Sequence, residues 1–558
     1  MKIAVVHGYF LNGTGSNLYV QNLCRQFCSL GHDVLLFCQE KQPGKYDFIE
    51  SAYRFDHDNQ HRVPIYTAKT PYPGKCSLYI PNIGAILPVY VWDKYEGFDA
   101  REITGLNQSE LESYISRNQK ALQTVFAQEQ PDLVISNHSV MQPVYVKRAL
   151  GDNCSTINLA VVHGSCLNFS VKKSALALHY AIEGLTAADG IVFLSDYASK
   201  EFTDYFQDKA TFTAQKILIP AGVDIERFIP LQNSAAKSER IGQLLQKIQS
   251  LPPADTEPSG ESDFISLFLD TPVERLPELK DRFLQRGDAK TIDADIPKKL
   301  LDIDWEKESI LLYYGKYLWT KGIHTLILSF PFVLRAHPHT KLILVGFGTS
   351  RSYLEALVAA LDVGDKERLR YLVTYPQHFQ THLEPGTQKY CQWALDLLAD
   401  DARADDLLAF CKGRIKDRVI FTGFMDHDLL KDLIPCADIA VAPSIFAEAF
   451  GLVGVEALAC GVFPLQPYHS GFKYVVDSYR ELFELHSQLK ALNKLYLNED
   501  LIPNLSFAIN TLLKAYGTDP ALPDKVKKTA RKICTDHYSW ASVAQNFVEA
   551  ASDVRAKN

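Results

Sequence analysis

The sequence predicts an α/β fold built from two doubly wound, Rossmann-like domains with helical insertions. The chain has 558 residues, which is too long for one ordinary hydrophobic core. Short apolar runs followed by glycine or polar residues occur in two separate series, as expected for strands of buried parallel sheets. A charged segment with several prolines, from about residue 233 to 306, separates the two series.

The first series begins at Lys2 to Val6, a short apolar run that we expect to form a strand. Gly13 and Gly15 follow, and then a helical pattern from Leu18 to Leu30 and a second apolar run from Val34 to Cys38. This order predicts a strand, a glycine loop, a helix and a second, parallel strand. Further strands are expected at residues 132–136, 157–162, 190–194 and 216–219.

The second series predicts another parallel sheet, with strands at residues 310–314, 341–345, 418–421, 439–442 and 462–465. The two series predict an N-terminal domain at 1–225, which a C-terminal helix at about 535–558 joins. A linker and inserted segment at 226–306 and a C-terminal domain at 307–534 complete the predicted division.

Two other stretches interrupt the strand pattern. An insertion at about residues 350–417 is expected at the surface, with a helix from Ala394 to Leu408. The apolar stretch at residues 78–92 contains prolines and is shorter than a bilayer-spanning helix, so we expect a buried or cleft-lining loop there.

Composition limits the classes of function. The 58 lysines and arginines against 66 acidic residues give a net charge of -8, without a long basic run, which argues against a nucleic-acid partner. Eleven cysteines without a Cys-x-x-Cys pair argue against a disulfide framework and a zinc ribbon. The first residues lack the pattern of a signal peptide, so we expect a cytoplasmic location.

The strongest chemical signal is the segment from Glu448 to Glu456, directly after the expected strand that ends near Pro443. Gly451 permits close backbone approach, and a helix that begins near Leu452 directs unpaired N–H groups and its positive dipole end at a ligand, for which phosphate is the natural occupant. Glu448 could accept hydrogen bonds from sugar hydroxyls, and Glu456 lies about one turn into the helix. The alternative is a pair of surface glutamates, one favoured by the helix dipole.

A complementary positive site is expected after the first strand of the second series. Lys316 and Lys321 lie five residues apart at the carboxyl end of a parallel strand, the edge where open α/β sheets bind ligands. They could converge on a diphosphate and stabilise the charge that develops as the donor bond breaks. The alternative is two solvated lysines.

The spacing Glu-x7-Glu of Glu448 and Glu456 resembles the signature of retaining GT-B glycosyltransferases of family 4, also called glycosyl transferases group 1. Other segments resemble motifs of that family in the same order, at residues 219–228, 315–322, 344–348, 421–424 and 538–540. The resemblance covers most of the chain outside residues 233–306 and about 350–417.

The resemblance implies a GT-B fold, in which two Rossmann-like domains face each other across a cleft. It implies a retaining transfer of a sugar from a UDP-, GDP- or ADP-sugar to a hydroxyl group of a carbohydrate, polyol or lipid-linked acceptor, without a metal or another cofactor. No side chain stands out as a covalent nucleophile, so we expect a front-face displacement assisted by the leaving phosphate. Peripheral membrane contact and the oligomeric state stay open.

Residue roles also follow from the resemblance. Glu448 would contact the sugar and Glu456 the ribose, while Lys316 and Lys321 would stabilise the leaving phosphate. Lys316 replaces an arginine that is commoner in the family, which keeps the charge but loses bidentate geometry. The remaining expected contacts are His163 beside the reacting sugar, the backbone of Phe450, Gly451 and Leu452 at the sugar and phosphate, Gly423 and Phe424 beside the base, and Gly13 and Gly15 near the donor phosphates or the acceptor.

Rival interpretations remain. The Gly13-x-Gly15 loop, with Glu40 at the end of the second strand, could belong to a nicotinamide-dependent oxidoreductase, although Leu18 occupies the third glycine position of that fingerprint. A catalytically silent protein that binds nucleotide sugars is a second alternative. His163 could be structural, and Asp-x-Asp sequences that could suggest a metal-bound diphosphate occur at residues 293–295, 302–304 and 426–428.

Overall fold

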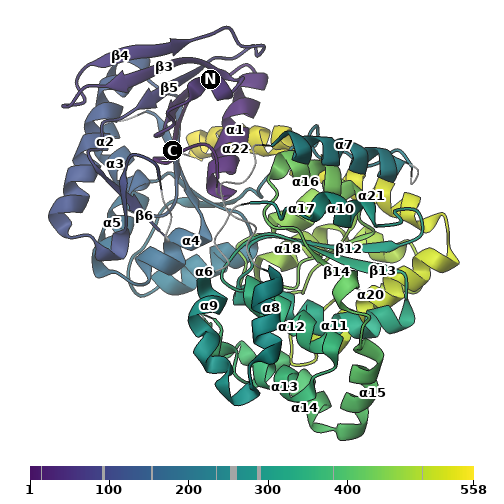
Figure 1. Cartoon of the computed structure of the whole chain (residues 1–558). Helices are drawn as coiled ribbons and strands as arrows, with labels where there is room; N and C mark the ends of the chain where they lie inside the picture. Colours follow the sequence, from purple (N-terminus) through teal and green to yellow (C-terminus); the bar gives the residue numbers. More distant parts are fainter. Residues whose placement is uncertain are drawn as a thin grey trace. The chain divides into compact units, whose positions relative to one another are not determined.

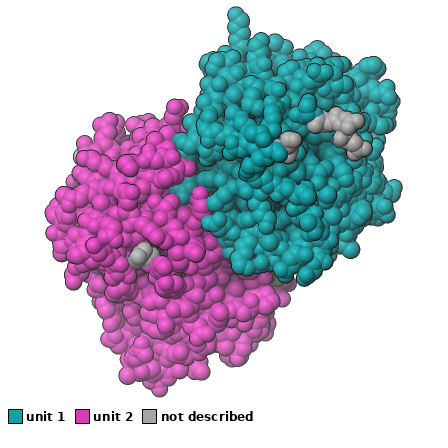
Figure 2. Space-filling view, turned by 180° about the vertical axis from the view of Figure 1, so that it is seen from behind, with its two compact units in different colours: residues 1–222, 538–558 teal, residues 223–537 magenta. Residues whose placement is uncertain are grey.

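The computed structural model (Figure 1) describes residues 1–13, 15–90, 95–151, 155–233, 236–251, 261–285, 291–380, 383–492 and 494–557. Two compact units are present, shown in different colours in Figure 2. Unit 1 comprises Met1–Gly222 with Tyr538–Asn558, and unit 2 comprises Val223–His537. Thr14 of the predicted glycine loop, Trp92 and the proline-containing stretch at 252–260 lie outside the described residues.

Unit 1 is built on a sheet with the strand order β11-β10-β9-β8-β1-β2-β5-β3-β4, in which neighbours are parallel except for β3 and β4. Every strand predicted in the first series is present: β1 (Lys2–Val6), β2 (Asp33–Phe37), β8 (Leu133–Asn137), β9 (Ile157–Val162), β10 (Gly190–Phe193) and β11 (Gln215–Leu218). Strands β1, β8, β9 and β10 are mainly apolar and almost wholly buried, as expected for strands of a covered parallel sheet, whereas β11 at the edge is only partly buried. The strands that follow β1 in the chain, β2 to β5, lie on one side of it, and β8 to β11 lie on the other, so the strand order reverses between β1 and β8.

The edge of this sheet adds strands that the sequence analysis did not predict: β3 (Ile49–Phe55), β4 (Arg62–Thr67) and β5 (Cys76–Ile80). Most residues of β4 are exposed, and it includes Pro64, so it lacks the buried apolar run used to recognise strands. The expectation of a loop at residues 78–92 was wrong. It begins in β5, and β6 (Ile86–Val89) pairs with β7 (Asp99–Glu102), which accommodates Pro88 in a two-stranded sheet.

The helices of unit 1 include the one that follows the glycine loop. They are α1 (Gly15–Ser29), α2 (Gln108–Glu129), α3 (Gln142–Leu150), α4 (Gly164–Cys166), α5 (Ala175–Thr186), α6 (Asp196–Phe206) and α22 (Trp540–Lys557). Figure 1 shows α22 beside α1 although they come from opposite ends of the sequence. Ring contacts between Tyr19 and Trp540, with centroids 5.2 Å apart, and between Phe27 and Phe547, at 6.5 Å, hold the two helices together.

Unit 2 has a parallel sheet with the order β14-β13-β12-β15-β16. Its strands match the second predicted series: β12 (Ser309–Tyr314), β13 (Thr340–Val345), β14 (Val419–Phe421), β15 (Ile439–Val441) and β16 (Phe463–Leu465). In this doubly wound order the chain first moves outward from β12 through β13 to β14 and then returns to β15. The boundary between β12 and β15 is therefore the topological switch point, where such sheets bind ligands at the carboxyl ends of the strands.

Helices surround the sheet of unit 2. They are α7 (Ala236–Ser250), α8 (Glu261–Asp270), α9 (Lys280–Gln285), α10 (Ile296–Leu301), α11 (Ile323–Ala336), α12 (Arg351–Val363), α13 (Lys366–Thr374), α14 (Gln392–Ala399), α15 (Asp401–Cys411), α16 (His427–Leu433), α17 (Leu452–Ala459), α18 (Ser470–Ser478), α19 (Arg480–Glu484), α20 (Leu501–Thr518) and α21 (Leu522–Tyr538). Within the described ranges, no helix is both long enough and apolar enough to cross a bilayer.

The insertion at 350–417 is not confined to the surface, contrary to our expectation. Nearly every residue of α12 is buried, because α8, α11 and α15 pack around it. The predicted helix from Ala394 to Leu408 is divided into α14 and α15 at Asp400, whose side chain accepts a hydrogen bond from the N–H of Arg403 at 3.2 Å and caps α15. The apolar periodicity continues through this break, which explains why it was missed.

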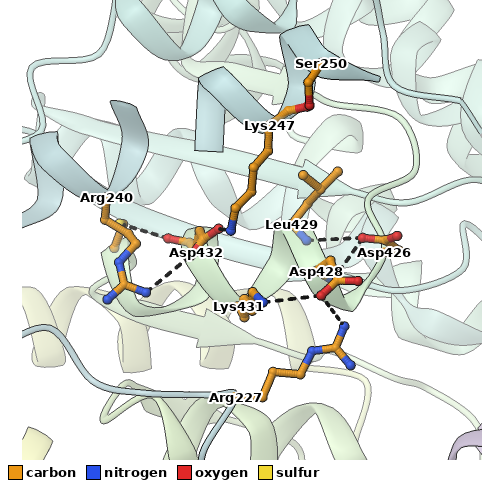
Figure 3. A network of polar contacts seen from close by, with 10 residues as sticks. Arg227, Arg240, Lys247, Ser250, Asp426, Asp428, Leu429, Lys431 and Asp432 are labelled. Atoms are coloured by element: carbon orange, nitrogen blue, oxygen red, sulfur yellow. Dashed lines mark hydrogen bonds and ion pairs between the residues drawn. The ribbon is translucent and has the colours of Figure 1, made fainter. Parts of the chain in front are cut away.

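Helix α7, from the segment between the two predicted domains, is bound to α16 of unit 2 by a polar network (Figure 3). Asp432 of α16 is 2% exposed and pairs with Arg240 at 3.2 Å and with Lys247. Arg227 approaches Asp428 at 2.9 Å, and Asp426 caps the helix through the N–H groups of residues 428 and 429. The carboxylates of α16 thus hold Arg227 and helix α7, which both precede it in the chain, against unit 2.

We expect Asp432→Asn to lower the free energy of unfolding by about 1–3 kcal/mol, because a buried carboxylate that accepts from two cations is replaced by a neutral amide. Asp428→Asn is the control on the same helix. Its carboxylate is 69% exposed, so the loss should stay below about 1 kcal/mol. Urea unfolding followed by circular dichroism measures both, and equal losses would contradict the importance of Asp432.

Candidate functional site

Two charged residues meet at the switch point of unit 2. Lys321 follows β12 in the chain, and Glu448 follows the neighbouring strand β15. The carboxyl ends of parallel strands lie at one edge of a sheet, so residues 127 positions apart in sequence come together there. The Lys321 ammonium forms an ion pair with Oε1 of Glu448, and their side chains are 32% and 21% exposed.

The Glu448 carboxylate is held on one side only. The Ser444 hydroxyl donates to Oε1, the oxygen that also pairs with Lys321, at 2.7 Å. Among the described residues, Oε2 of Glu448 has no hydrogen-bond partner. One oxygen is therefore fixed by the protein while the other can accept a hydrogen bond from a ligand.

Gly451 ends the loop and is the N-cap residue of α17. Its φ is +110°, and a Cβ there would lie 2.3 Å from Cδ1 of Phe472, so no side chain fits at this position. No side chain in the described part of the chain caps the helix at Gly451, which leaves its first N–H groups for water or a ligand. Phe450 is buried, with its ring centroid 6.0 Å from that of Tyr474, and Leu452 is half-buried. The loop thus offers a ligand its backbone rather than its apolar side chains.

Glu456 lies inside α17 and is 8% exposed. Its Oε1 is 3.0 Å from Nε2 of His427, the first residue of α16. Burial lowers the pKa of His427, but the charge and hydrogen bond of Glu456, with help from Asp426, outweigh burial and the nearby Arg227 and leave that pKa above its ordinary value. The sequence analysis did not identify His427, although a histidine directly after a helix-capping aspartate was a usable signal.

Gly423 and Phe424 lie just beyond β14, where the segment at 291–293 runs alongside them. The N–H of Phe424 donates to the carbonyl of Thr291 at 2.9 Å, and a Cβ on Gly423 would lie 2.3 Å from that same carbonyl oxygen. The Phe424 ring is partly exposed and meets Phe347 edge to face at 5.3 Å. The segment at 291–293 therefore bonds to the backbone beside this aromatic pair. Sequence patterns alone could not indicate this contact.

The Asp-x-Asp sequences have structural roles. Asp293 accepts a hydrogen bond from Nη1 of Arg351 at 2.8 Å and from Nη2 at 2.5 Å. Asp304 pairs with Lys307 at 2.9 Å, and Asp426 caps α16. Within the described ranges, no group of three or more histidine, cysteine, aspartate or glutamate side chains is placed to hold a metal ion.

The two predicted lysines differ in their surroundings. Lys316 is exposed, and no carboxylate pairs with it in the part of the chain that the structure describes. Its carbonyl accepts a hydrogen bond from the Tyr313 hydroxyl at 2.9 Å, which fixes the backbone but leaves the ammonium group in solvent. Lys321, by contrast, is joined to Glu448.

In unit 1 a row of three histidines lies at the carboxyl ends of neighbouring strands. His7, His138 and His163 directly follow β1, β8 and β9, which are adjacent and parallel. The ring centroids of His7 and His138 are 5.9 Å apart, and those of His138 and His163 are 4.8 Å apart. Only His163 was selected from the sequence. The signal that would have found the other two is a histidine one residue beyond each predicted neighbouring strand.

All three imidazoles are neutral at physiological pH. Burial lowers the pKa of His7 to about 4 and that of His163 to about 3, and the repulsion that a protonated His7 would exert lowers the pKa of His163 further. Burial also lowers the pKa of His138, whose two ring nitrogens have no partner among the described residues and whose φ is +71°. Nε2 of His163 lies 3.2 Å from Oδ1 of Asn137, which fixes the ring.

The glycine loop of unit 1 is fastened by Asn17. Its Oδ1 is 2.9 Å from Nε2 of His7, and its Nδ2 donates to the carbonyl of Asn12 at 2.6 Å. Gly13 has a φ of +107° and Gly15 is the first residue of α1; both are exposed. This part of the loop is therefore accessible while its base is tied to β1.

Glu40, the residue that favoured nicotinamide binding, is 4% exposed. Its carboxylate accepts hydrogen bonds from the N–H of Gln42 and the hydroxyl of Tyr46, both at 2.9 Å, and from the N–H of Leu11 at 3.3 Å. These bonds occupy the group that the dinucleotide fingerprint assigns to a ribose.

Comparison with known proteins finds similarity in the part of the chain that holds this site. Residues 411–504, which include Glu448, α17 and Glu456, match the family described as Glycosyl transferases group 1. The chain is 24% identical over 243 residues to an uncharacterized glycosyltransferase of Methanocaldococcus jannaschii, covering 44% of each chain. It is 26% identical over 242 residues to a glycogen synthase of Mycobacterium tuberculosis, covering 42% of this chain and 40% of that protein.

The chain thus spans less than half the length of these curated relatives. A solved structure, sucrose-phosphate synthase from Thermosynechococcus elongatus, aligns over 100% of both chains with a TM-score of 0.51 and 16% identity. At this identity the likeness shows the fold alone, and it confirms the GT-B fold that the sequence predicted.

The His427–Glu456 pair makes a pH-dependent contribution to stability. Because Glu456 raises the folded-state pKa of His427, the contribution is fully present below the unfolded value of about 6.5 and is lost as pH rises through the folded pKa. In Glu456→Gln the main influences that remain on His427 are burial and Arg227, which both lower its pKa. We therefore expect the pKa of His427 to fall below its ordinary value. An NMR titration of the imidazole checks this, and an unchanged midpoint would contradict the pairing.

Proposed function

We propose that the protein is a retaining glycosyltransferase that moves a sugar from a nucleotide diphosphate sugar to a hydroxyl acceptor. The observation that carries this proposal is the pair of Lys321 and Glu448 at the switch point of unit 2, next to the uncapped start of α17. A cation, a helix N-terminus and a carboxylate with one free oxygen suit a ligand that joins a diphosphate to a polyhydroxylated ring.

The proposed donor contacts follow from chemistry. The N–H groups at Gly451 and Leu452 and the ammonium of Lys321 would bind the diphosphate, and Lys316 would add a cation from solvent. Oε2 of Glu448 would accept a hydrogen bond from the transferred sugar. Glu456 would bind the ribose while His427 fixes its orientation, and the partly exposed ring of Phe424 would lie beside the base.

We place the acceptor, a carbohydrate, polyol or lipid-linked hydroxyl compound, on unit 1. His163, which is 8% exposed, and the exposed glycines of the loop can exchange hydrogen bonds with uncharged hydroxyls, while the buried His7 and His138 lie behind His163. His163 contributes as a neutral, oriented hydrogen-bonding group, because its lowered pKa removes the imidazolium form at physiological pH.

For the chemical step we propose front-face displacement. The bond from the anomeric carbon to the phosphate oxygen breaks as the acceptor oxygen forms a bond on the same face, and the acceptor proton passes to the departing phosphate. Lys316, Lys321 and the helix N-terminus would stabilise the charge that develops on that phosphate. A covalent intermediate is not needed, and retention follows from attack on the face that the leaving group vacates.

We expect Glu448→Gln and Lys321→Met each to lower kcat by about 10²–10³-fold, because each removes a charged partner of the reacting ligand. Release of nucleoside diphosphate from a panel of UDP-, GDP- and ADP-hexoses measures this. Lys490→Met is the control, since it breaks an ion pair with Glu484 in which both side chains are at least 59% exposed. Wild-type rates in both site variants would refute the assignment.

A separate prediction concerns binding. Glu456→Gln should raise the Kd of the matching nucleoside diphosphate by about tenfold, since a charged acceptor of ribose hydrogen bonds becomes a neutral amide. Glu448→Gln should leave that Kd nearly unchanged, because its proposed partner is the sugar, which this ligand lacks. Isothermal titration calorimetry distinguishes the two, and equal Kd values for wild type and Glu456→Gln would remove the ribose role.

A further inference from the structure

We propose that Ser470 is a positioning residue for Glu448, through a closed ring of hydrogen bonds that begins and ends on that glutamate. This inference rests on the proposed function, because the position of the carboxylate matters only if it contacts the donor sugar. It concerns Ser470 and His469, to which neither the sequence patterns nor the comparisons assign a role.

Ser470 begins α18 in a conformation that serine disfavours. Its φ is +43°, in the left-handed region, and it is the one non-glycine residue of unit 2 with positive φ among those the structure describes. Glycine would adopt this backbone without the steric cost of a Cβ. Backbone strain of this kind persists only where the surrounding contacts hold it, and it clusters at functional sites.

The hydroxyl of Ser470 has two partners. It accepts a hydrogen bond from the N–H of Glu448 at 2.9 Å, and it lies 3.0 Å from Nδ1 of His469. Nε2 of His469 lies 2.9 Å from the carbonyl oxygen of Ser444, which can only accept, so Nε2 carries the ring proton. Burial lowers the pKa of His469, which keeps the ring neutral, and Nδ1 therefore accepts the proton of the Ser470 hydroxyl.

The ring closes through Ser444. This residue is 3% exposed, and its hydroxyl donates to Oε1 of Glu448 at 2.7 Å. The path thus runs from the Glu448 N–H to Ser470, to His469, to the Ser444 backbone and from the Ser444 side chain back to the Glu448 carboxylate. Both the backbone and the side chain of the glutamate are set by one connected group of donors and acceptors.

The backbone next to Ser470 is tied to the same loop. The N–H of Gly471 donates to the carbonyl of Glu448 at 2.7 Å, and a Cβ at Gly471 would lie 2.4 Å from the carbonyl oxygen of Ala449. The start of α18 therefore lies directly against the glutamate loop. A substitution of Ser470 can remove the hydrogen bond between its hydroxyl and the Glu448 N–H without changing the packing of a large side chain.

Ser470→Gly separates the two roles that a serine here can have. It removes the hydroxyl and also removes the steric cost of the positive φ, so the thermal midpoint should stay at or above that of the wild type. With Glu448 no longer held through its N–H, kcat should fall by about tenfold or more while KM for the nucleotide sugar changes by less than about twofold. Ser470→Ala, which keeps the strain, should show the same fall in kcat with a lower thermal midpoint.

The matched control is Ser478→Ala at the other end of α18, whose hydroxyl donates to the carbonyl of Val475 at 2.6 Å. It should leave kcat unchanged. If Ser470→Gly keeps a kcat within twofold of the wild type, or loses kcat only in proportion to a loss of folded protein, the positioning role is overturned while the proposed function stands. If the wild-type protein turns over no nucleotide sugar, the proposed function fails and the positioning role fails with it.

Discussion

The candidate site of unit 2 depends on one constraint, the parallel pairing of β12 with β15 at the point where strand order reverses. This pairing brings the residues that follow both strands to one edge, where Lys321 meets Glu448. The first charge comes from the turn into α11 and the second from the loop into α17. The strands under the candidate site are almost wholly buried, and the loops that follow them carry its charged residues.

The second glutamate is supported differently. Glu456 pairs with His427, and His427 begins a helix that also carries Asp428 and Asp432. Those two carboxylates hold Arg227 and the helix α7, which come from the chain between the two strand series. The inserted segment thus stabilises α16, and α16 orients the histidine that contacts Glu456. A segment without recognisable motifs still contributes to the geometry of the site.

Sequence patterns predicted the central strands because these are buried on both faces and read as apolar runs. They did not predict β4, whose exposed edge and Pro64 carry no such run, nor the burial of α12. Lys321, Glu448 and Glu456 were found through spacing and resemblance. His427, His469 and Ser470 were not, because their roles arise from contacts between elements that are distant along the chain. A backbone φ of +43° at a serine has no signature in the sequence.

The two units differ in the charge that their strand ends present, and this difference bears on what each can bind. In unit 1 the row of histidines is neutral, so it presents no net charge to a phosphate. In unit 2 an unpaired carboxylate about 5 Å from a phosphate would cost about 3 kcal/mol at an effective dielectric constant near 20. The ion pair with Lys321 neutralises the Glu448 carboxylate before a ligand binds, so Glu448 can offer an acceptor oxygen to a sugar next to a diphosphate. On the proposed function, the units therefore separate an anionic donor from an uncharged acceptor by electrostatics before shape has any effect.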